Sequence, residues 1–258
     1  KRLGADVMSM NIVNSAIKKG ETLIDTAMTL NAMHPDIIVI RHQDSGACNL
    51  LSQKVNCAVL NAGDGRREHP TQALLDALTI IDRKKKISGL KIAICGDILH
   101  SRVARSNIWA LTAFGANIVL CGPENLVPKG FSIVEQNLGE FKDPIKDRGS
   151  ITISRKINES LKDADAVIVL RLQKERMEEK LLGIVDSYSS EFCLTPEILK
   201  LNNNDIPVLH PGPINRGIEI SSTIVDEYPN CLINNQVSNS VPVRMALLYL
   251  ASKFNKRI

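Results

Sequence analysis

Short apolar runs alternate along the whole chain with segments of helical periodicity. The apolar runs predict buried strands at 37–41, 58–62, 90–95, 117–121, 166–170 and 206–210, with shorter strands at 6–10 and 231–234. Apolar positions three and four residues apart predict helices at 22–32, 46–53, 70–82, 101–114 and 241–254. Short strands separated by helices favour parallel sheets, so the pattern predicts an α/β protein with helices flanking each sheet, similar to the Rossmann arrangement.

A basic run, Arg83–Lys86, interrupts this alternation near residue 84. A solvated helix end is the favoured interpretation, because cations are stable at helix C-termini. We place a domain boundary here. The first domain is expected to comprise residues 1–84 joined by a closing helix at 240–258, and the second to comprise residues 85–239.

The composition is that of an ordinary globular protein, with 258 residues, 44% apolar residues and 23% charged residues. A net charge of +4 is too small to indicate nucleic-acid binding, and the basic run at 83–86 is the one feature that favours it. Aromatic residues make up only 3% of the chain, so few side chains could stack on bases. No apolar run approaches the ~18 residues of a membrane span, and we expect no signal peptide. The six cysteines form no C-x-x-C pair. We therefore expect a cytoplasmic protein that binds neither membranes nor nucleic acid.

The common cofactor and nucleophile motifs are absent. Gly96 follows a predicted strand without the further glycines of a dinucleotide fingerprint, and neither a phosphate-loop motif nor a G-x-S-x-G elbow occurs. The five histidines lack metal-ligand spacing. We expect neither a cofactor nor a metal.

Arginines cluster instead where predicted strands end. Arg41 and Arg171 each end a strand, and His210 ends another. Arg102 and Arg105 lie in the first turn of a predicted helix, where their charges oppose the helix dipole. Ligands of open α/β sheets bind beyond the carboxyl ends of the strands. The arginines together indicate a small polyanionic ligand, although surface ion pairs remain the alternative for any single one.

Four blocks of sequence, in order, resemble the aspartate carbamoyltransferase family. Gly63–Gly65 followed by His69–Asp76 resembles the family's carbamoyl-phosphate motif, and Lys18–Thr22 resembles its mobile lysine loop. Arg171–Arg176 resembles its aspartate motif, and His210–Gly217 its proline-rich loop. The blocks span nearly the whole chain.

The resemblance implies the carbamoyltransferase fold, whose first domain binds carbamoyl phosphate and whose second binds L-aspartate. It implies transfer of the carbamoyl group to the aspartate amine, in pyrimidine biosynthesis, without cofactor or metal. It also implies a homotrimer with active sites shared between subunits, with a regulatory or dihydroorotase partner possible. The family's Ser-Thr-Arg-Thr motif precedes the stretch that Lys1–Ala5 matches, so we expect the natural protein to extend further toward its N-terminus.

On the carbamoyl-phosphate side, the resemblance implies that Arg41 and His69 polarise the carbamoyl oxygen and that Gln72 accepts from the carbamoyl nitrogen. Ser15 and Lys19 match positions that a neighbouring subunit contributes. Pro211 and Gly212 belong to the loop whose backbone carbonyls meet the carbamoyl nitrogen and the attacking amine. A helix-entry cap is the alternative role for His69, and plain loop charge for Lys19.

On the aspartate side, the resemblance implies that Arg102 and Arg171 bind the carboxylates, with Gln173 and Lys19 beside them. An ion pair with Glu175 at i+4 is the alternative for Arg171.

Two other functions of the protein stay open. One is a carbamoyltransferase that acts on another amine such as ornithine. The ornithine enzymes are marked by a His-Cys-Leu-Pro loop, however, at the place where this chain has His210–Pro213. The other is a non-catalytic paralogue that acts as a scaffold subunit.

Overall fold

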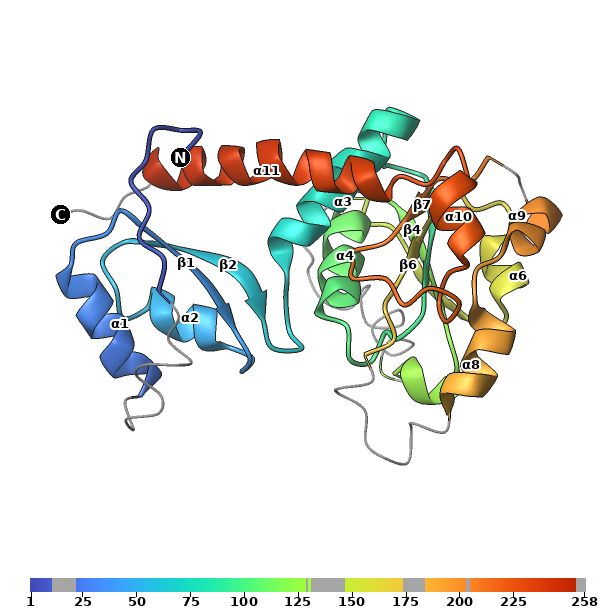
Figure 1. The fold of residues 1–258 in the computed structure, drawn as a ribbon, viewed down its shortest axis with the longest axis horizontal. Helices are drawn as coiled ribbons and strands as arrows, with labels where there is room; N and C mark the ends of the chain where they lie inside the picture. Colours follow the sequence, from blue (N-terminus) through green and yellow to red (C-terminus); the bar gives the residue numbers. More distant parts are fainter. Residues whose placement is uncertain (11–21, 129, 131–146, 174–183, 203–204, 254–258) are drawn as a thin grey trace. The chain divides into compact units, whose positions relative to one another are not determined.

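The computed structural model describes residues 1–10, 22–128, 130, 147–173, 184–202 and 205–253, and only the backbone of residues 184–187 (Figure 1). These residues form two compact units. We call Lys1–Thr71 together with Ser240–Ile258 the first unit, and Gln72–Asn239 the second unit.

The first unit is built on two parallel strands. Its elements are α1 (Leu23–Ala32), β1 (Ile37–His42), α2 (Ala47–Ser52) and β2 (Ala58–Asp64). Helix α1 begins as predicted, because the Thr22 side chain and the Asp25 carboxylate cap each other's backbone N–H groups. The two helices bury Ala27, Cys48 and Leu51 against Ile40 of β1.

The second unit contains a five-stranded parallel sheet in the order β5-β4-β3-β6-β7. Its strands are β3 (Lys91–Cys95), β4 (Asn117–Cys121), β5 (Ile151–Ser154), β6 (Ala166–Val169) and β7 (Val208–Leu209). The chain runs outward from β3 to β5 and then returns to β6 beside β3. The order of the strands therefore reverses between β3 and β6.

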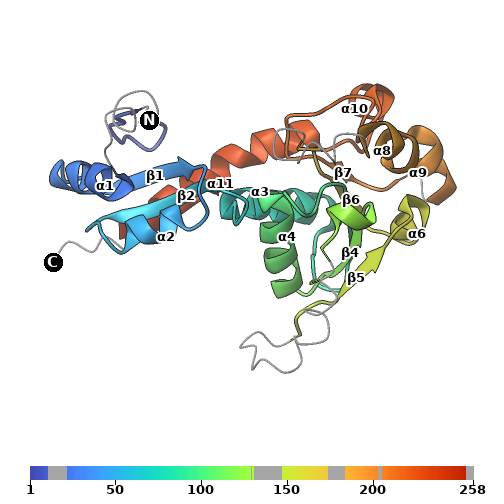
Figure 2. The same cartoon turned by 90° about the horizontal axis from the view of Figure 1, so that it is seen from below.

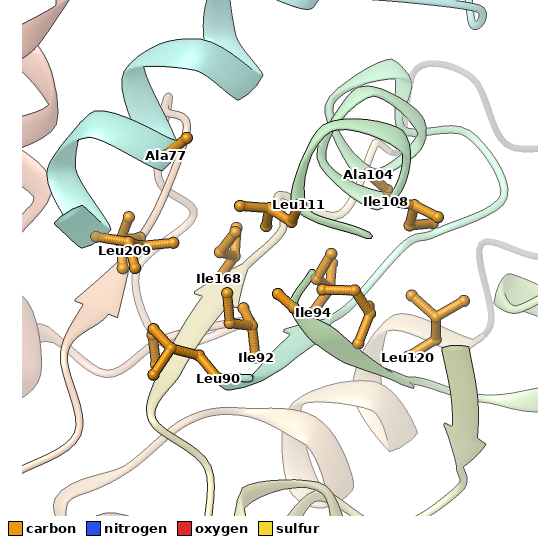
Figure 3. Close-up of a cluster of buried hydrophobic side chains, with 14 of the residues drawn as sticks. Ala77, Leu90, Ile92, Ile94, Ala104, Ile108, Leu111, Leu120, Ile168 and Leu209 are labelled. Atoms are coloured by element: carbon orange, nitrogen blue, oxygen red, sulfur yellow. The ribbon is translucent and has the colours of Figure 1, made fainter. Parts of the chain in front are cut away.

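Helices cover both faces of this sheet (Figures 1 and 2). They are α3 (Pro70–Lys84), α4 (Arg102–Ala113), α6 (Ile157–Leu161), α8 (Ile184–Phe192), α9 (Pro196–Asn202), α10 (Ser222–Glu227) and the start of α11 (Ile233–Lys253), with a 3₁₀ turn at Glu124–Leu126. Side chains alternate along the strands: Ile92 and Ile94 pack toward α3 and α4 (Figure 3), whereas Ala93 and Cys95 pack toward the opposite helices. Burial on both faces explains why these strands read as continuous apolar runs.

Two predicted strands are wrong. Residues 6–10 form no regular structure, and Cys231 makes only an isolated bridge with Val208 before α11 begins at Ile233. A short apolar run does not distinguish a strand from the start of a helix. The strand at Ile151–Ser154 was missed, because its Ile-Thr-Ile-Ser sequence is not a continuous apolar run like those of the strands that were predicted.

Helix α11 is longer than predicted. The sequence placed its start at 241, because the recognised apolar positions, from Met245 to Leu250, lie in that stretch. The helix instead starts at Ile233 and includes Pro242 in its interior. Its first turns belong to the second unit and the rest to the first. None of the helices in the described part of the chain is long and apolar enough to span a bilayer.

Candidate active site

The carboxyl ends of β3 and β6 form a switch point in the second unit, because the strand order reverses between them. In open α/β sheets a ligand crevice opens at such a point. Gly96 follows β3 with φ +130°, and a Cβ at this position would lie 2.8 Å from the Leu170 carbonyl oxygen. Only glycine therefore allows the two strand ends to approach this closely.

A buried carboxylate joins the two strand ends. Oδ1 of Asp97 accepts from the His100 backbone N–H at 3.1 Å and lies 2.9 Å from His100 Nδ1. Oδ2 accepts from the Gln173 backbone N–H at 3.3 Å, and the Gln173 side chain donates to the His100 carbonyl at 3.2 Å. Gln173, predicted as an aspartate ligand, is thus held in place by Asp97 and His100, which follow β3.

Arg102 begins the next helix at the same edge. Ser101 caps α4 by accepting from the Ala104 N–H at 3.1 Å, and this cap sets the direction of the first turn. Arg102 is 7% exposed although it carries a charge. Arg105 donates to the Leu99 carbonyl at 3.2 Å and so braces the loop before the helix.

The loop after β7 reaches this edge too. The Asn215 side chain donates to the Leu172 carbonyl at 3.3 Å, which ties the proline-rich loop to the segment that carries Arg171 and Gln173. The Gly212–Pro213 peptide bond is cis. The structure thus brings Arg102, Arg171, Gln173, Pro211 and Gly212 to one edge of the sheet.

His210 holds a defined tautomer in this loop. Its Nδ1 accepts from the Gly212 N–H at 2.9 Å, so the proton resides on Nε2, which lies 3.3 Å from Glu219 Oε1. The same Glu219 oxygen accepts from the Asn215 N–H at 2.6 Å. His210 and Glu219 are both buried, and they fix the shape of the loop rather than face solvent.

Arg41 and His69 lie in the first unit. Arg41 is exposed in β1, and the next residue, His42, pairs with Asp64 at the end of β2. The buried Asp64 carboxylate accepts from the Gly46 N–H at 2.9 Å, and the Asp64 backbone N–H donates to the Glu68 carbonyl at 2.8 Å in the turn that leads to His69. His69 Nδ1 lies 3.4 Å from the Thr71 hydroxyl at the start of α3.

Gln72 follows in the first turn of α3 and is 7% exposed. Its amide donates to the Asp76 carboxylate at 2.9 Å, one helical turn further on. Burial raises the pKa of Asp76 to about 6, although hydrogen bonds from Asn107, Gln236 and Gln72 act in the opposite direction. Ser15 and Lys19 lie outside the described residues.

The sequence placed Asp76 in the carbamoyl-phosphate motif but assigned no role to it, nor to Asp97, His100, Glu219 or Gln236. The Gln72–Asp76 spacing of i,i+4 on a predicted helix was a usable signal, because such pairs form hydrogen bonds. Gln236 offered none, since it lies 160 residues from Asp76. Among the described residues, no group of three or more histidine, cysteine, aspartate or glutamate side chains could hold a metal ion.

Comparison with known proteins identifies two adjoining domains of one family. Residues 1–82 match the carbamoyl-P binding domain of aspartate/ornithine carbamoyltransferase, and residues 88–251 match its Asp/Orn binding domain. The aspartate carbamoyltransferase catalytic subunit of Prochlorococcus marinus (strain MIT 9515) is 58% identical, over 99% of this chain and 80% of the relative. That of Pelagibacter ubique is 60% identical, over 96% of this chain and 74% of the relative.

Solved structures agree with this assignment. The aspartate transcarbamoylase of Trypanosoma cruzi in complex with carbamoyl phosphate superposes with a TM-score of 0.82 at 30% identity, over 96% of this chain and 76% of that one. The ornithine carbamoyltransferase of Pyrococcus furiosus gives the same TM-score at 27% identity, over the same shares. The predicted fold is confirmed, and the chain belongs to the aspartate/ornithine carbamoyltransferase family.

Proposed function

We propose that this protein transfers the carbamoyl group of carbamoyl phosphate to the amine of L-aspartate, giving N-carbamoyl-L-aspartate and phosphate, a step in pyrimidine biosynthesis. The observation that carries the proposal is 58% identity, over almost the whole chain, with a protein named as an aspartate carbamoyltransferase catalytic subunit. The Trypanosoma cruzi relative has been solved with carbamoyl phosphate and aspartate, and with carbamoyl aspartate and phosphate.

The reaction needs positioning and charge stabilisation rather than a covalent intermediate. The amine lone pair attacks the carbamoyl carbon, the new C–N bond forms, the C–O bond to phosphate breaks, and the amine loses a proton. Holding the two substrates in contact can supply roughly 7–11 kcal/mol of the rate enhancement. Each preorganised donor to the developing oxyanion can add about 3–4 kcal/mol.

The carbamoyl-phosphate residues are assigned by their match to the family motifs. Arg41 and His69 polarise the carbamoyl oxygen, and Gln72 accepts from the carbamoyl nitrogen. The backbone at Pro211 and Gly212 faces the carbamoyl nitrogen and the amine. The hydrogen bonds of His210 and Asn215 support this assignment, because they give the loop one defined shape.

Arg102 and Arg171 bind the two aspartate carboxylates, with Gln173 beside them. Their common place at the carboxyl edge of β3 and β6 supports this role, since that edge is where ligands of such sheets bind. Forked guanidinium donors suit carboxylates, whereas ornithine would call for acidic partners. The His210–Pro213 loop also differs from the His-Cys-Leu-Pro of ornithine enzymes.

The family resemblance further supports a cytoplasmic homotrimer in which Ser15 and Lys19 reach the site of a neighbouring subunit, with a regulatory or dihydroorotase subunit as a further partner. Light scattering at micromolar concentration tests the trimer. A mass of three chains is expected, and a monomer at all concentrations would contradict the shared site.

The function is tested by measuring phosphate release from carbamoyl phosphate with L-aspartate or with L-ornithine. The 258-residue chain is assayed beside a form extended by the upstream residues of its gene. Aspartate-dependent release is expected. Release with ornithine alone would reassign the acceptor, and no release from either form would favour the scaffold role. Arg171→Ala should raise the KM for aspartate at least tenfold and leave the KM for carbamoyl phosphate within about threefold.

A further inference from the structure

Asp76 is the centre of a buried hydrogen-bond network in the second unit. Its side chain is fully buried, at 0% exposure. Oδ1 accepts from Gln72 Nε2 at 2.9 Å and from Gln236 Nε2 at 2.7 Å, and Oδ2 accepts from Asn107 Nδ2 at 2.8 Å. Three helices, α3, α4 and α11, therefore meet on one carboxylate.

This arrangement decides which way each amide points. An ionised carboxylate has acceptors and no donor, so each of the three amides must present its NH₂ group to Asp76. In Gln72 the carbonyl oxygen then lies on the opposite arm of the amide. That oxygen is the atom that the proposed function assigns to the carbamoyl nitrogen.

The network also extends to the proline-rich loop. Gln236 donates to Asp76 with Nε2 and accepts from the His210 backbone N–H with Oε1 at 2.8 Å. One residue of α11 thus spans the distance between α3 and the loop. The two groups assigned to the carbamoyl nitrogen, Gln72 and the backbone after His210, are held by the same chain of hydrogen bonds.

We propose that Asp76 is a positioning residue of the carbamoyl-phosphate site, which acts by fixing the Gln72 amide with its oxygen toward the carbamoyl nitrogen. The proposal rests on the proposed function. Asp76 itself touches no substrate and does its work through Gln72. Gln236 sets the distance between this amide and the His210 loop.

The acceptor oxygen, rather than the charge, performs this role. Gln72 and Gln236 both donate to Oδ1, which an asparagine at position 76 retains. The NH₂ of that asparagine would face Asn107, whose Oδ1 is buried and has no hydrogen-bond partner among the described residues. Turning the Asn107 amide over pairs that oxygen with the new NH₂ group and moves the Asn107 NH₂ to the place that has no partner, a cost that does not reach Gln72 or Gln236. Asp76→Asn therefore preserves the hydrogen bonds of Gln72 and Gln236, whereas Asp76→Leu, of similar size, removes the acceptor.

The test measures kcat and KM for carbamoyl phosphate at saturating aspartate for the wild type, Asp76→Asn and Asp76→Leu. We expect the Asn variant to stay within about threefold of the wild type. We expect the Leu variant to lose about 10–100-fold in kcat/KM, mainly through KM, as is typical when a supporting hydrogen bond to a ligand-binding group is removed. Circular dichroism and thermal melting establish that each variant folds.

A double-mutant cycle separates positioning from a general structural role. In a Gln72→Ala background, Asp76→Leu should cost less than about threefold, because the group through which Asp76 acts is absent. If the Leu variant does not fold, Asp76→Glu takes its place, since it keeps the charge but displaces the oxygen. Equal losses in both backgrounds, or a folded Leu variant with wild-type kcat/KM, would overturn the proposal.

Asp82→Asn is the matched control. Asp82 lies on the same helix α3, is exposed, and accepts at 2.9 Å from the Asn239 side chain of α11. The Asp82→Asn substitution should change kcat/KM less than twofold.

The two proposals can fail separately. If the wild type binds carbamoyl phosphate in calorimetry but does not transfer the carbamoyl group, only the proposed function is wrong. The variants of Asp76 are then expected to rank in their Kd for carbamoyl phosphate as they would have ranked in kcat/KM. If the wild type neither binds carbamoyl phosphate nor transfers the carbamoyl group, both the proposed function and the role of Asp76 are wrong.

Discussion

The Asp97 carboxylate and the Gln173 backbone N–H, 76 positions apart in sequence, lie 3.3 Å from each other across the switch point of the sheet. This bond holds the segment after β6 against the loop after β3. Both segments carry residues assigned to aspartate binding, so the bond helps to fix the positions of Arg102 and Gln173 relative to each other.

Replacing Asp97 should impair the aspartate site. Asp97→Ala leaves the buried His100 N–H and the half-buried Gln173 N–H without their acceptor, which costs about 1–3 kcal/mol of folding free energy for a buried group left unsatisfied. We expect the KM for aspartate to rise at least tenfold in steady-state assays. Glu159→Gln, which breaks the exposed Lys156–Glu159 pair, should change neither quantity measurably. An unchanged KM for aspartate in Asp97→Ala would refute this role.

The buried charge of Asp76 should show in the pH dependence of stability. Burial raises the pKa of the Asp76 carboxyl from 3.8 to about 6 in the folded state, so the folded protein binds this proton more tightly than the unfolded chain. The resulting stabilisation is complete below pH 3.8 and is lost as the pH rises through 6. The wild type should therefore gain about 3 kcal/mol relative to Asp76→Asn between pH 7 and pH 3.5. Urea unfolding at several pH values measures this difference, and a constant difference would contradict it.

Gly65 should tolerate no side chain. Its φ is +50°, and a Cβ there would lie 2.6 Å from the Ser45 backbone nitrogen. Gly65→Ala therefore combines backbone strain with a clash and should destabilise by more than about 2 kcal/mol. In Gly89→Ala only the strain of a φ of +79° applies, because nothing lies within 4 Å of the added Cβ. Calorimetric melting should show the larger loss for Gly65→Ala, and equal losses would rule out the clash.

Leu111 should contribute strongly to the core of the second unit. It is 0% exposed and packs from α4 on the sheet (Figure 3). Leu111→Ala should cost about 2–5 kcal/mol in chemical unfolding, because it removes apolar contacts and leaves a cavity. The control is Leu201→Ala on α9, where the side chain is 75% exposed and should cost less than about 0.5 kcal/mol. Similar losses at both positions would contradict the assigned core.

The sequence determined the elements whose patterns are long and local. The apolar runs at 90–95 and 117–121 became β3 and β4, and the helix predicted at 22–32 became α1. Local signals succeed there because burial, strand periodicity and helix periodicity each depend on residues a few positions apart. The motif blocks identified the family for the same reason, since each block is contiguous.

Only the tertiary structure decided where the network around Asp76 lies and which strands meet at the switch point. Asp76, Asn107 and Gln236 come from three helices, and nothing near any one of them in sequence names its partners. It also decided that residues 231–234 end in the first turn of α11 rather than form a strand. Hydrogen bonds between distant segments exist only once packing has brought those segments together, so no local pattern records them.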